Sequence, residues 1–256
     1  PRSAVPDSHV GRPPGTLVGG MIPLYDDNRT RRFPVVTVAL ITTNAAVFVA
    51  QLLLPRWGLT TESWFLLFGA RPIELTQHVD LAPSEWVPWW ATLITALFVH
   101  AGWLHVVFNM WYLWIFGNNV EDAMTRPRYL VFYLACGMAA TATQVLAAPA
   151  SDVPIVGASG AVAGVLGAYL VLYPRARVFT VIPLVVVWPV LELPAWVLLV
   201  VWFALQGLGG VRSYGSAEAG VAFFAHIGGF VAGMALAAVF ATRGRRGRPL
   251  RARRRV

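Results

Sequence analysis

Long apolar runs separated by short polar loops make up most of the chain. A transmembrane helix needs about 20 mostly apolar residues in a row, and six segments reach or approach that length: residues 35–54, 93–116, 129–148, 155–173, 193–208 and 221–241. Pro183 and Pro189 interrupt residues 178–192, so we expect this segment to be an interfacial or re-entrant lead into the fifth helix. The pattern predicts an all-α polytopic membrane protein, a bundle of six transmembrane helices.

The composition agrees with this class and excludes an ordinary soluble domain. Hydrophobic residues make up 57% of the chain and charged residues only 12%, against roughly 25% charged in a soluble globular domain. The one cysteine, Cys136, lies in an apolar segment. Neither a disulfide framework nor a cysteine-based metal site is therefore expected.

The placement of arginine predicts the orientation of the bundle. All 20 basic residues are arginine, against 12 acidic residues, which gives a formal charge of +8. If both termini are cytoplasmic, only Arg56, Arg71 and Arg212 fall on the outer side, as the excess of positive charge in cytoplasmic loops requires. We expect a multi-pass protein of a bacterial cytoplasmic membrane with both ends inside.

This organisation predicts one membrane domain with two tails. Residues 1–34 are expected to be a flexible cytoplasmic segment, residues 35–241 the six-helix membrane domain, and residues 242–256 an Arg-rich cytoplasmic tail. Such arginine clusters next to a membrane are typical of contact with anionic lipid headgroups. No nucleic-acid partner is expected.

Few polar side chains interrupt the predicted spans, and polar residues at such depth are candidates for function. His105, Ser159 and His226 belong to three spans that all begin from the outer side, so they are expected at a similar depth toward the outer part of the membrane. His105 and Asn109 are four residues apart and point the same way from one helix. Both can donate hydrogen bonds to an oxyanion that develops during hydrolysis of an amide.

Helical spacing places the serine and the second histidine on small-residue faces. Ser159 shares a face with Gly160, and His226 shares a face with Gly229 and Gly233. Small residues let two helices approach closely. The two faces could therefore bring Ser159 and His226 within hydrogen-bond reach, which a nucleophile and its base need.

Each of these features also has a plainer explanation. The glycines of GASG at 157–160 fit small-residue packing, a histidine in a span fits a structural hydrogen bond, and His105 with Asn109 fits polar contacts between helices. A metal or proton transporter built on His100, His105 and His226 is a further alternative, although the span interiors lack the carboxylates expected beside an ion path.

Four segments occur together in a fixed order: HAGWLHVVFNM at 100–110, GNNVE ending at Glu121, GASG at 157–160 and AHIGGFVAGM at 225–234. On these segments the chain resembles the rhomboid family of intramembrane serine proteases, across nearly all six predicted spans. The resemblance implies a serine endopeptidase that hydrolyses peptide bonds in or near the transmembrane segments of other membrane proteins, with its active site open to the extracytoplasmic side.

The resemblance also implies roles for single residues. Ser159 would be the nucleophile and His226 its general base, in a dyad without an acidic third member. His105, Asn109 and the backbone N–H of Ser159 would form the oxyanion hole. Structural support is implied for Gly157, Gly160, His100, Glu121, Gly229 and Gly233, and neither a cofactor nor a metal is implied.

Two positions depart from the family pattern. Thr92 stands where many relatives carry the arginine of a Trp-Arg pair, and Ala163 stands where many carry an aromatic residue that stacks on the base. The histidine at 226 would then have to be oriented by other contacts. An inactive rhomboid-like protein that binds transmembrane helices is the alternative function, although such proteins normally lack the serine or the histidine.

Overall fold

The computed structural model describes residues 21–81, 86–183, 187–213 and 222–242, and these residues are mostly helical. The longer helices are α1 (Val35–Leu52), α5 (Trp103–Ala123), α6 (Arg126–Ala147), α7 (Ser159–Leu172), α8 (Ala195–Ser213) and α9 (Phe223–Phe240). Between α1 and α5 lie the shorter η1 (Leu54–Trp57), α2 (Thr61–Phe68), α3 (Pro72–Gln77), α4 (Thr92–Thr95) and η3 (Ala96–Phe98).

Three helices within the described ranges are long and apolar enough to cross a membrane, namely α1, α6 and α9. A fourth candidate is the bent pair formed by residues Thr92–Phe98 and α5, which meet at 95°. Two further apolar helices, α7 and the part of α8 at Ala195–Val211, are shorter. Each of the six expected segments thus contains an apolar helix, while the count of six spans stays a prediction.

The segment of the expected span at 93–116 is broken near its start. The backbone is extended at Val99, and α5 begins only at Trp103 and continues to Ala123. The backbone N–H of Ala101 donates to Nδ1 of His105 at 3.4 Å, so the turn before α5 is held by a side chain of the helix itself. Hydropathy is high on both sides of this break, and an average over the segment therefore does not reveal it.

A small antiparallel sheet was not expected from the sequence. It consists of β1 (Ile22–Asp26), β2 (Arg177–Val181) and β3 (Val190–Pro194) in the order β1-β2-β3. The strands β2 and β3 lie at the two ends of the segment 178–192, which was expected to be an interfacial or re-entrant lead, and β1 lies in the segment 1–34 that was expected to be flexible. Residues 1–20 and the tail from 243 onward lie outside the described residues.

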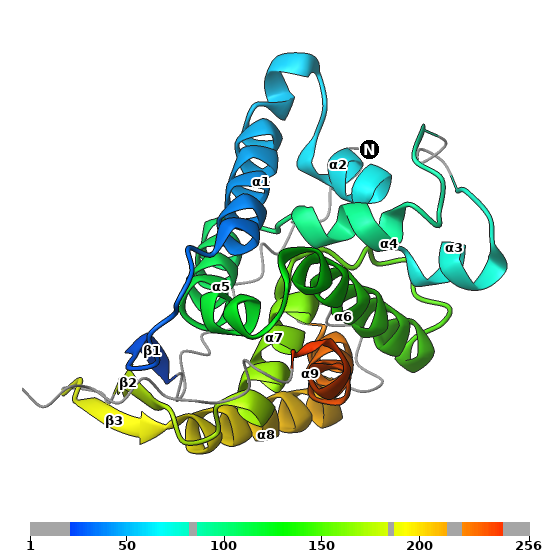
Figure 1. Ribbon diagram of the computed structural model, residues 1–256. Coiled ribbons are helices and arrows are strands. Elements are labelled where there is room, and N and C mark those ends of the chain that lie inside the picture. The colour runs from blue at the N-terminus through cyan, green and yellow to red at the C-terminus, as the bar shows by residue number, and fades with distance from the viewer. Residues whose placement is uncertain (1–20, 82–85, 184–186, 214–221, 243–256) are drawn as a thin grey trace, which may run out of the picture.

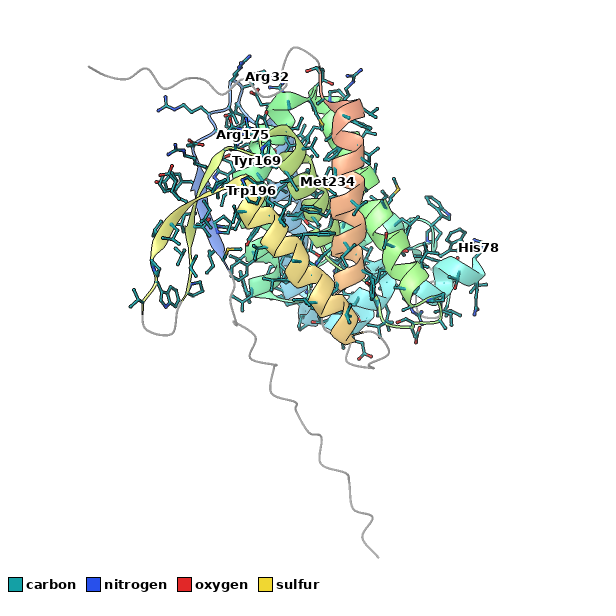
Figure 2. The ribbon with its side chains drawn as sticks, turned by 90° about the horizontal axis from the view of Figure 1, so that it is seen from below. Arg32, His78, Tyr169, Arg175, Trp196 and Met234 are labelled. Carbon is teal, nitrogen blue, oxygen red and sulfur yellow. The ribbon has the colours of Figure 1, made fainter. Side chains whose placement is uncertain are left out.

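Helix α7 forms the centre of the bundle, with α5, α6, α8 and α9 around it (Figure 1). All its residues from Gly160 to Tyr169 are buried. Viewed from below, α8 and α9 run side by side, with the sheet at one edge of the bundle and His78 at the opposite edge (Figure 2). Neighbouring helices on several sides therefore hold α7, whose first residue is Ser159.

Large apolar side chains cover the outer surface of the longer helices. Among the most exposed are Leu104, Leu146, Val211 and Val239, with exposed fractions of 73%, 82%, 76% and 72%. Such a continuous apolar exterior would be costly in water and is typical of contact with lipid.

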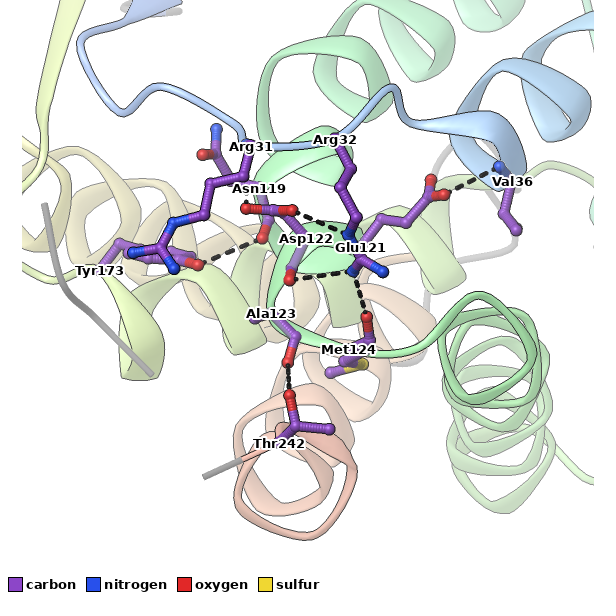
Figure 3. Close-up of polar contacts among 10 residues, drawn as sticks. All are labelled: Arg31, Arg32, Val36, Asn119, Glu121, Asp122, Ala123, Met124, Tyr173 and Thr242. Carbon is purple, nitrogen blue, oxygen red and sulfur yellow. Dashed lines mark hydrogen bonds and ion pairs between the residues drawn. The ribbon is translucent and has the colours of Figure 1, made fainter. Parts of the chain in front are cut away.

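Glu121 joins the end of α5 to the start of α1. Its carboxylate accepts a hydrogen bond from the backbone N–H of Val36 at 3.0 Å (Figure 3), and two more from the backbone N–H and the hydroxyl of Thr37, both at 2.8 Å. The first N–H groups of a helix lack partners within the helix, and an acidic side chain satisfies them well. Glu121, only 3% exposed, therefore caps α1 from a distant part of the sequence.

Candidate active site

Ser159 is the first residue of α7, and the loop before it is fixed by backbone hydrogen bonds. Ala70 and Ile155 exchange two such bonds, at 3.0 and 2.9 Å, and Gly157 N–H donates to the carbonyl of Ala96 at 2.9 Å. The N–H of Ser159 belongs to the first turn of the helix, where backbone donors lack partners within the helix. The half-buried serine thus sits where a negative charge would be stabilised.

Gly157 lies directly against the imidazole of His105. Its φ is +120°, a conformation that residues with a Cβ rarely adopt, and a Cβ built there would lie 2.6 Å from Cε1 and 2.7 Å from Nε2 of His105. Only glycine therefore allows the imidazole to pack against this loop. The contact brings Nε2 of His105 to the segment that leads into Ser159.

The hydrogen bonds of His105 define which ring nitrogen can donate. Because Nδ1 accepts from the backbone N–H of Ala101, the proton of the neutral ring is on Nε2, the atom that faces Gly157. His100 is fully buried and packs edge-on against His105, with ring centroids 5.1 Å apart. The carbonyl of His100 accepts from Nε2 of Gln51 at 2.8 Å, which fixes it to α1.

Asn109 lies one turn after His105 on α5. It is 6% exposed, and within the described part of the chain its Nδ2 has no hydrogen-bond partner. A buried amide donor is almost always satisfied, and an exception is typical of a functional group that waits for a ligand or water.

The register between α7 and α9 brings Ser159 and His226 to the same level. A Cβ at Gly229 would lie 2.0 Å from the carbonyl oxygen of Gly160, and one at Gly233 would lie 1.9 Å from that of Gly164. A Cβ at Gly160 would in turn lie 3.8 Å from the carbonyl oxygen of Ala225. Gly160 and Ala225, the direct neighbours of Ser159 and His226, therefore lie close together, and the two small-residue faces pack against each other.

His226 receives its contacts from α8. Its Nδ1 is 2.7 Å from Oε1 of Gln206, and the ring of Trp202 lies with its centroid 6.0 Å away. Within the described residues no hydrogen bond joins Ser159 to His226, and such bonds are often long before substrate binds and tighten only with substrate in place.

Sequence reasoning missed Gln206. It is an uncharged amide in the segment 193–208, and its chemistry is less obvious than that of the histidines, the serine and the carboxylates. The signal was present, because an amide in an apolar span is costly unless it has a partner.

The loop before α4 is anchored by Arg71 rather than by a residue at position 92. Arg71 is 5% exposed, and its guanidinium binds Glu74 at 2.9 Å and, through Nε, Asp152 at 3.0 Å. Thr92 is buried and donates its hydroxyl to the carbonyl of Trp89. The Arg71–Asp152 contact ties the loop that follows α1 to the loop that leads to Ser159.

Within residues 21–81, 86–183, 187–213 and 222–242, no group of three or more His, Cys, Asp or Glu side chains is arranged to hold a metal ion. His100 and His105 pack together, but these histidines and His226 do not form such a group.

Comparison with known proteins gives the class. A family model described as the rhomboid domain matches residues 88–243. The chain is 35% identical over 113 residues to Rhomboid protease GluP of Bacillus subtilis, an alignment that covers 44% of this chain and 20% of that protein. It is 35% identical over 82 residues to Putative rhomboid protease YdcA of Bacillus subtilis, covering 32% of this chain and 40% of that protein.

A third relative is Rhomboid protein 1, mitochondrial, of Saccharomyces cerevisiae, which is 29% identical over 162 residues, or 62% of this chain and 44% of that protein. In all three cases the chain covers less than half of the relative's length. The matched domain takes in more than half of the chain and contains all of the candidate site. The chain belongs to the rhomboid family and is an integral membrane protein.

Proposed function

We propose that the chain is an intramembrane serine endopeptidase in which Ser159 is the nucleophile and His226 the general base. The observation that carries the proposal is the packing of α7 on α9 through glycines, which brings the neighbours of the serine and the histidine close together. Polar side chains inside membrane spans are rare and are candidates for function, and packing alone does not explain why a serine and a histidine lie on these two facing helices.

The chemistry follows from these positions. As Ser159 Oγ attacks a peptide carbonyl, Nε2 of His226 takes the hydroxyl proton and then passes it to the leaving amine when the C–N bond breaks. A water molecule attacks the resulting ester in the same way, which releases the acid and restores the serine. No carboxylate takes part.

The oxyanion is assigned to three donors: Nε2–H of His105, Nδ2 of Asn109 and the backbone N–H of Ser159. The unpartnered Nδ2 of Asn109 and the Nε2–H tautomer of His105 support this assignment. Removing one such donor reduces kcat about 10²–10³-fold in a soluble serine protease. Gly157, Gly160, His100, Glu121, Gly229 and Gly233 support the site by packing or by hydrogen bonds.

The substrates we propose are transmembrane segments of other proteins. Peptide bonds in a helix are engaged in hydrogen bonds, so a segment with helix-breaking residues unwinds more readily into an active site within the membrane. We place both termini in the cytoplasm of a bacterium and the site toward the extracytoplasmic side, with six spans, because this arrangement leaves three arginines outside. The Arg-rich ends then lie near anionic headgroups.

The test is cleavage of a single-pass transmembrane substrate by the purified chain in liposomes. We expect wild type to cleave, and Ser159→Ala and His226→Ala each to abolish cleavage. Ser151→Ala is the matched control, because Ser151 lies in the preceding loop, away from α9, and this variant is expected to cleave like wild type.

Two outcomes would contradict the proposal. If folded wild type cleaves no faster than Ser159→Ala across several substrates, the chain is an inactive rhomboid-like protein that binds transmembrane helices. If purified chain carries stoichiometric metal that is lost with His105→Ala, the transporter alternative gains support.

A further inference from the structure

Gln206 is the group that holds the ring of His226. The distance between Oε1 of Gln206 and Nδ1 of His226 is 2.7 Å, within the normal range for a hydrogen bond, and the contact is partly buried. The two residues come from different helices, α8 and α9. This bond therefore holds a side chain of α9 through a side chain of α8.

The chemistry of the two groups decides where the proton lies. A carbonyl oxygen can only accept a hydrogen bond, so Nδ1 of His226 must carry the hydrogen, and in the neutral ring Nε2 then has a lone pair. That is the form a general base needs in order to take a proton from a serine hydroxyl. With the amide of Gln206 turned over, its NH₂ group would donate to Nδ1, and the hydrogen would move to Nε2, where it would block this role.

The contacts that can orient the ring of His226 come from α8. Ala163, on the helix that carries Ser159, has only a methyl group and cannot stack on the ring. Trp202, one turn before Gln206 on α8, lies 6.0 Å from His226 with its ring tilted by 39°. A Cβ at Gly209 would lie 2.2 Å from Phe223, so the same part of α8 is closely packed on the start of α9.

We propose that Gln206 is a positioning residue for His226, which holds the ring in its Nδ1–H tautomer with Nε2 directed away from α8. It takes the place that a carboxylate occupies in a Ser-His-Asp triad, without bringing a charge into the membrane. Because the bond bridges α8 and α9, Gln206 holds the ring of His226 only while these helices are packed together. The catalytic consequence of this inference rests on the proposed function, whereas the tautomer of His226 does not depend on it.

The first test is the ¹⁵N spectrum of the full chain labelled at histidine, in detergent at pH 8. The signals of His226 are identified by their loss in His226→Ala. We expect the Nδ1–H tautomer in wild type and a mixture of tautomers in Gln206→Met, which keeps the length of the side chain but not the acceptor oxygen. A wild-type ring protonated at Nε2 would overturn the inference whether or not the chain cleaves anything.

The matched control is Gln144→Met. Gln144 also directs its Oε1 to α9, where it accepts from the backbone N–H of Ala225 at 3.3 Å, one residue before the histidine. The same substitution thus removes a bond to the same turn of α9 without touching the ring, and the Nδ1–H tautomer should persist. An equal change of tautomer in both variants would mean that general loosening of α9 is responsible, which contradicts a specific role for Gln206.

Cleavage kinetics provide the second test. We expect Gln206→Met to lower kcat about tenfold to a hundredfold with KM nearly unchanged, a smaller loss than the roughly 10⁴-fold loss when the aspartate of a triad is replaced by asparagine. Gln206→Glu, which keeps an acceptor oxygen, should retain the tautomer and recover most of kcat. If wild type is active and Gln206→Met has an unchanged kcat, the positioning role of Gln206 is overturned but the proposed function is not. If wild type is inactive and His226 still shows the expected tautomer, the proposed function alone is overturned.

Discussion

Gly157 has little tolerance for change. Its φ is positive, and a Cβ there would lie 2.6 Å from the ring of His105, so there is no room for a methyl group. We expect Gly157→Ala to lower the free energy of unfolding by about 1–3 kcal/mol and to displace His105, which would reduce kcat. Thermal unfolding and cleavage rates check this.

Gly102 offers the comparison for that substitution. It precedes α5 with an extended backbone, and a Cβ there would have nothing within 4 Å. Gly102→Ala should therefore unfold and cleave like wild type. Equal losses in the two variants would mean that the tight contact between Gly157 and His105 has no special importance.

Replacement of Asn109 should affect catalysis and stability differently. Its Nδ2 makes no hydrogen bond within the described part of the chain, so its removal breaks none of the bonds that hold the fold. We expect Asn109→Ala to reduce kcat about 10²–10³-fold, with a small change in KM and in thermal stability. A variant that loses stability and kcat in proportion would instead indicate a structural role.

At the scale of elements, the contact between α7 and α9 depends on backbone touching backbone. A Cβ at Gly233 would lie 1.9 Å from the carbonyl oxygen of Gly164. Gly233→Ala must therefore push the helices apart, and we expect a loss of about 1–3 kcal/mol together with a loss of cleavage, because Ser159 and His226 separate. Unfolding in detergent and cleavage measure the two effects.

The control for Gly233 is Gly207→Ala on α8. A Cβ at Gly207 meets nothing within 4 Å, and alanine favours a helix over glycine by up to about 1 kcal/mol. This variant should be at least as stable as wild type. If Gly233→Ala were equally harmless, close packing of α7 on α9 would not be what holds the site.

The helices were predictable because a long apolar run has few alternatives to a helix in lipid, and the small faces of α7 and α9 followed from spacing alone. The break before α5 was not predictable in this way, since it involves a hydrogen bond between Ala101 and His105 that hydropathy does not reveal. The sheet also escaped prediction, because β1 lies about 150 residues before its partner β2.

At the site, the sequence indicated the residues that carry obvious chemistry, but neither Gln206 nor the contacts between segments were predicted. The contact between Gly157 and His105 and the bond from Gln206 to His226 both join segments that are distant in sequence. Which amide meets which ring is decided by helix packing, and spacing within one helix does not contain that information.

At the scale of the whole molecule, the sheet is attached to the bundle through Asp26. Its carboxylate accepts hydrogen bonds from Nδ2 of Asn119 at 2.8 Å and from the hydroxyl of Tyr169, on α5 and α7. Burial raises the pKa of Asp26 from 3.8 to about 7, although the bond from Tyr169 opposes this. The folded chain therefore holds this proton over a range of pH in which the unfolded chain releases it.

This difference predicts how stability depends on pH. Between about pH 4 and pH 7 the unfolded state binds fewer protons at Asp26 than the folded state, so the free energy of unfolding should fall as the pH rises and level off above pH 7. Asp26→Asn keeps the shape and removes the titration, and its stability should lack this contribution. Unfolding curves of both proteins across that range test it, and identical slopes would refute the role of Asp26.

Labelling with a serine-directed fluorophosphonate, read by mass spectrometry of the intact and digested chain, tests whether Ser159 is an activated nucleophile. It does not require the natural substrate. We expect one adduct per chain, on Ser159, that is absent in Ser159→Ala and strongly reduced in His226→Ala while Ser151→Ala labels normally. A folded wild type that takes no label, or a Ser159→Ala variant labelled as well as wild type, would contradict it.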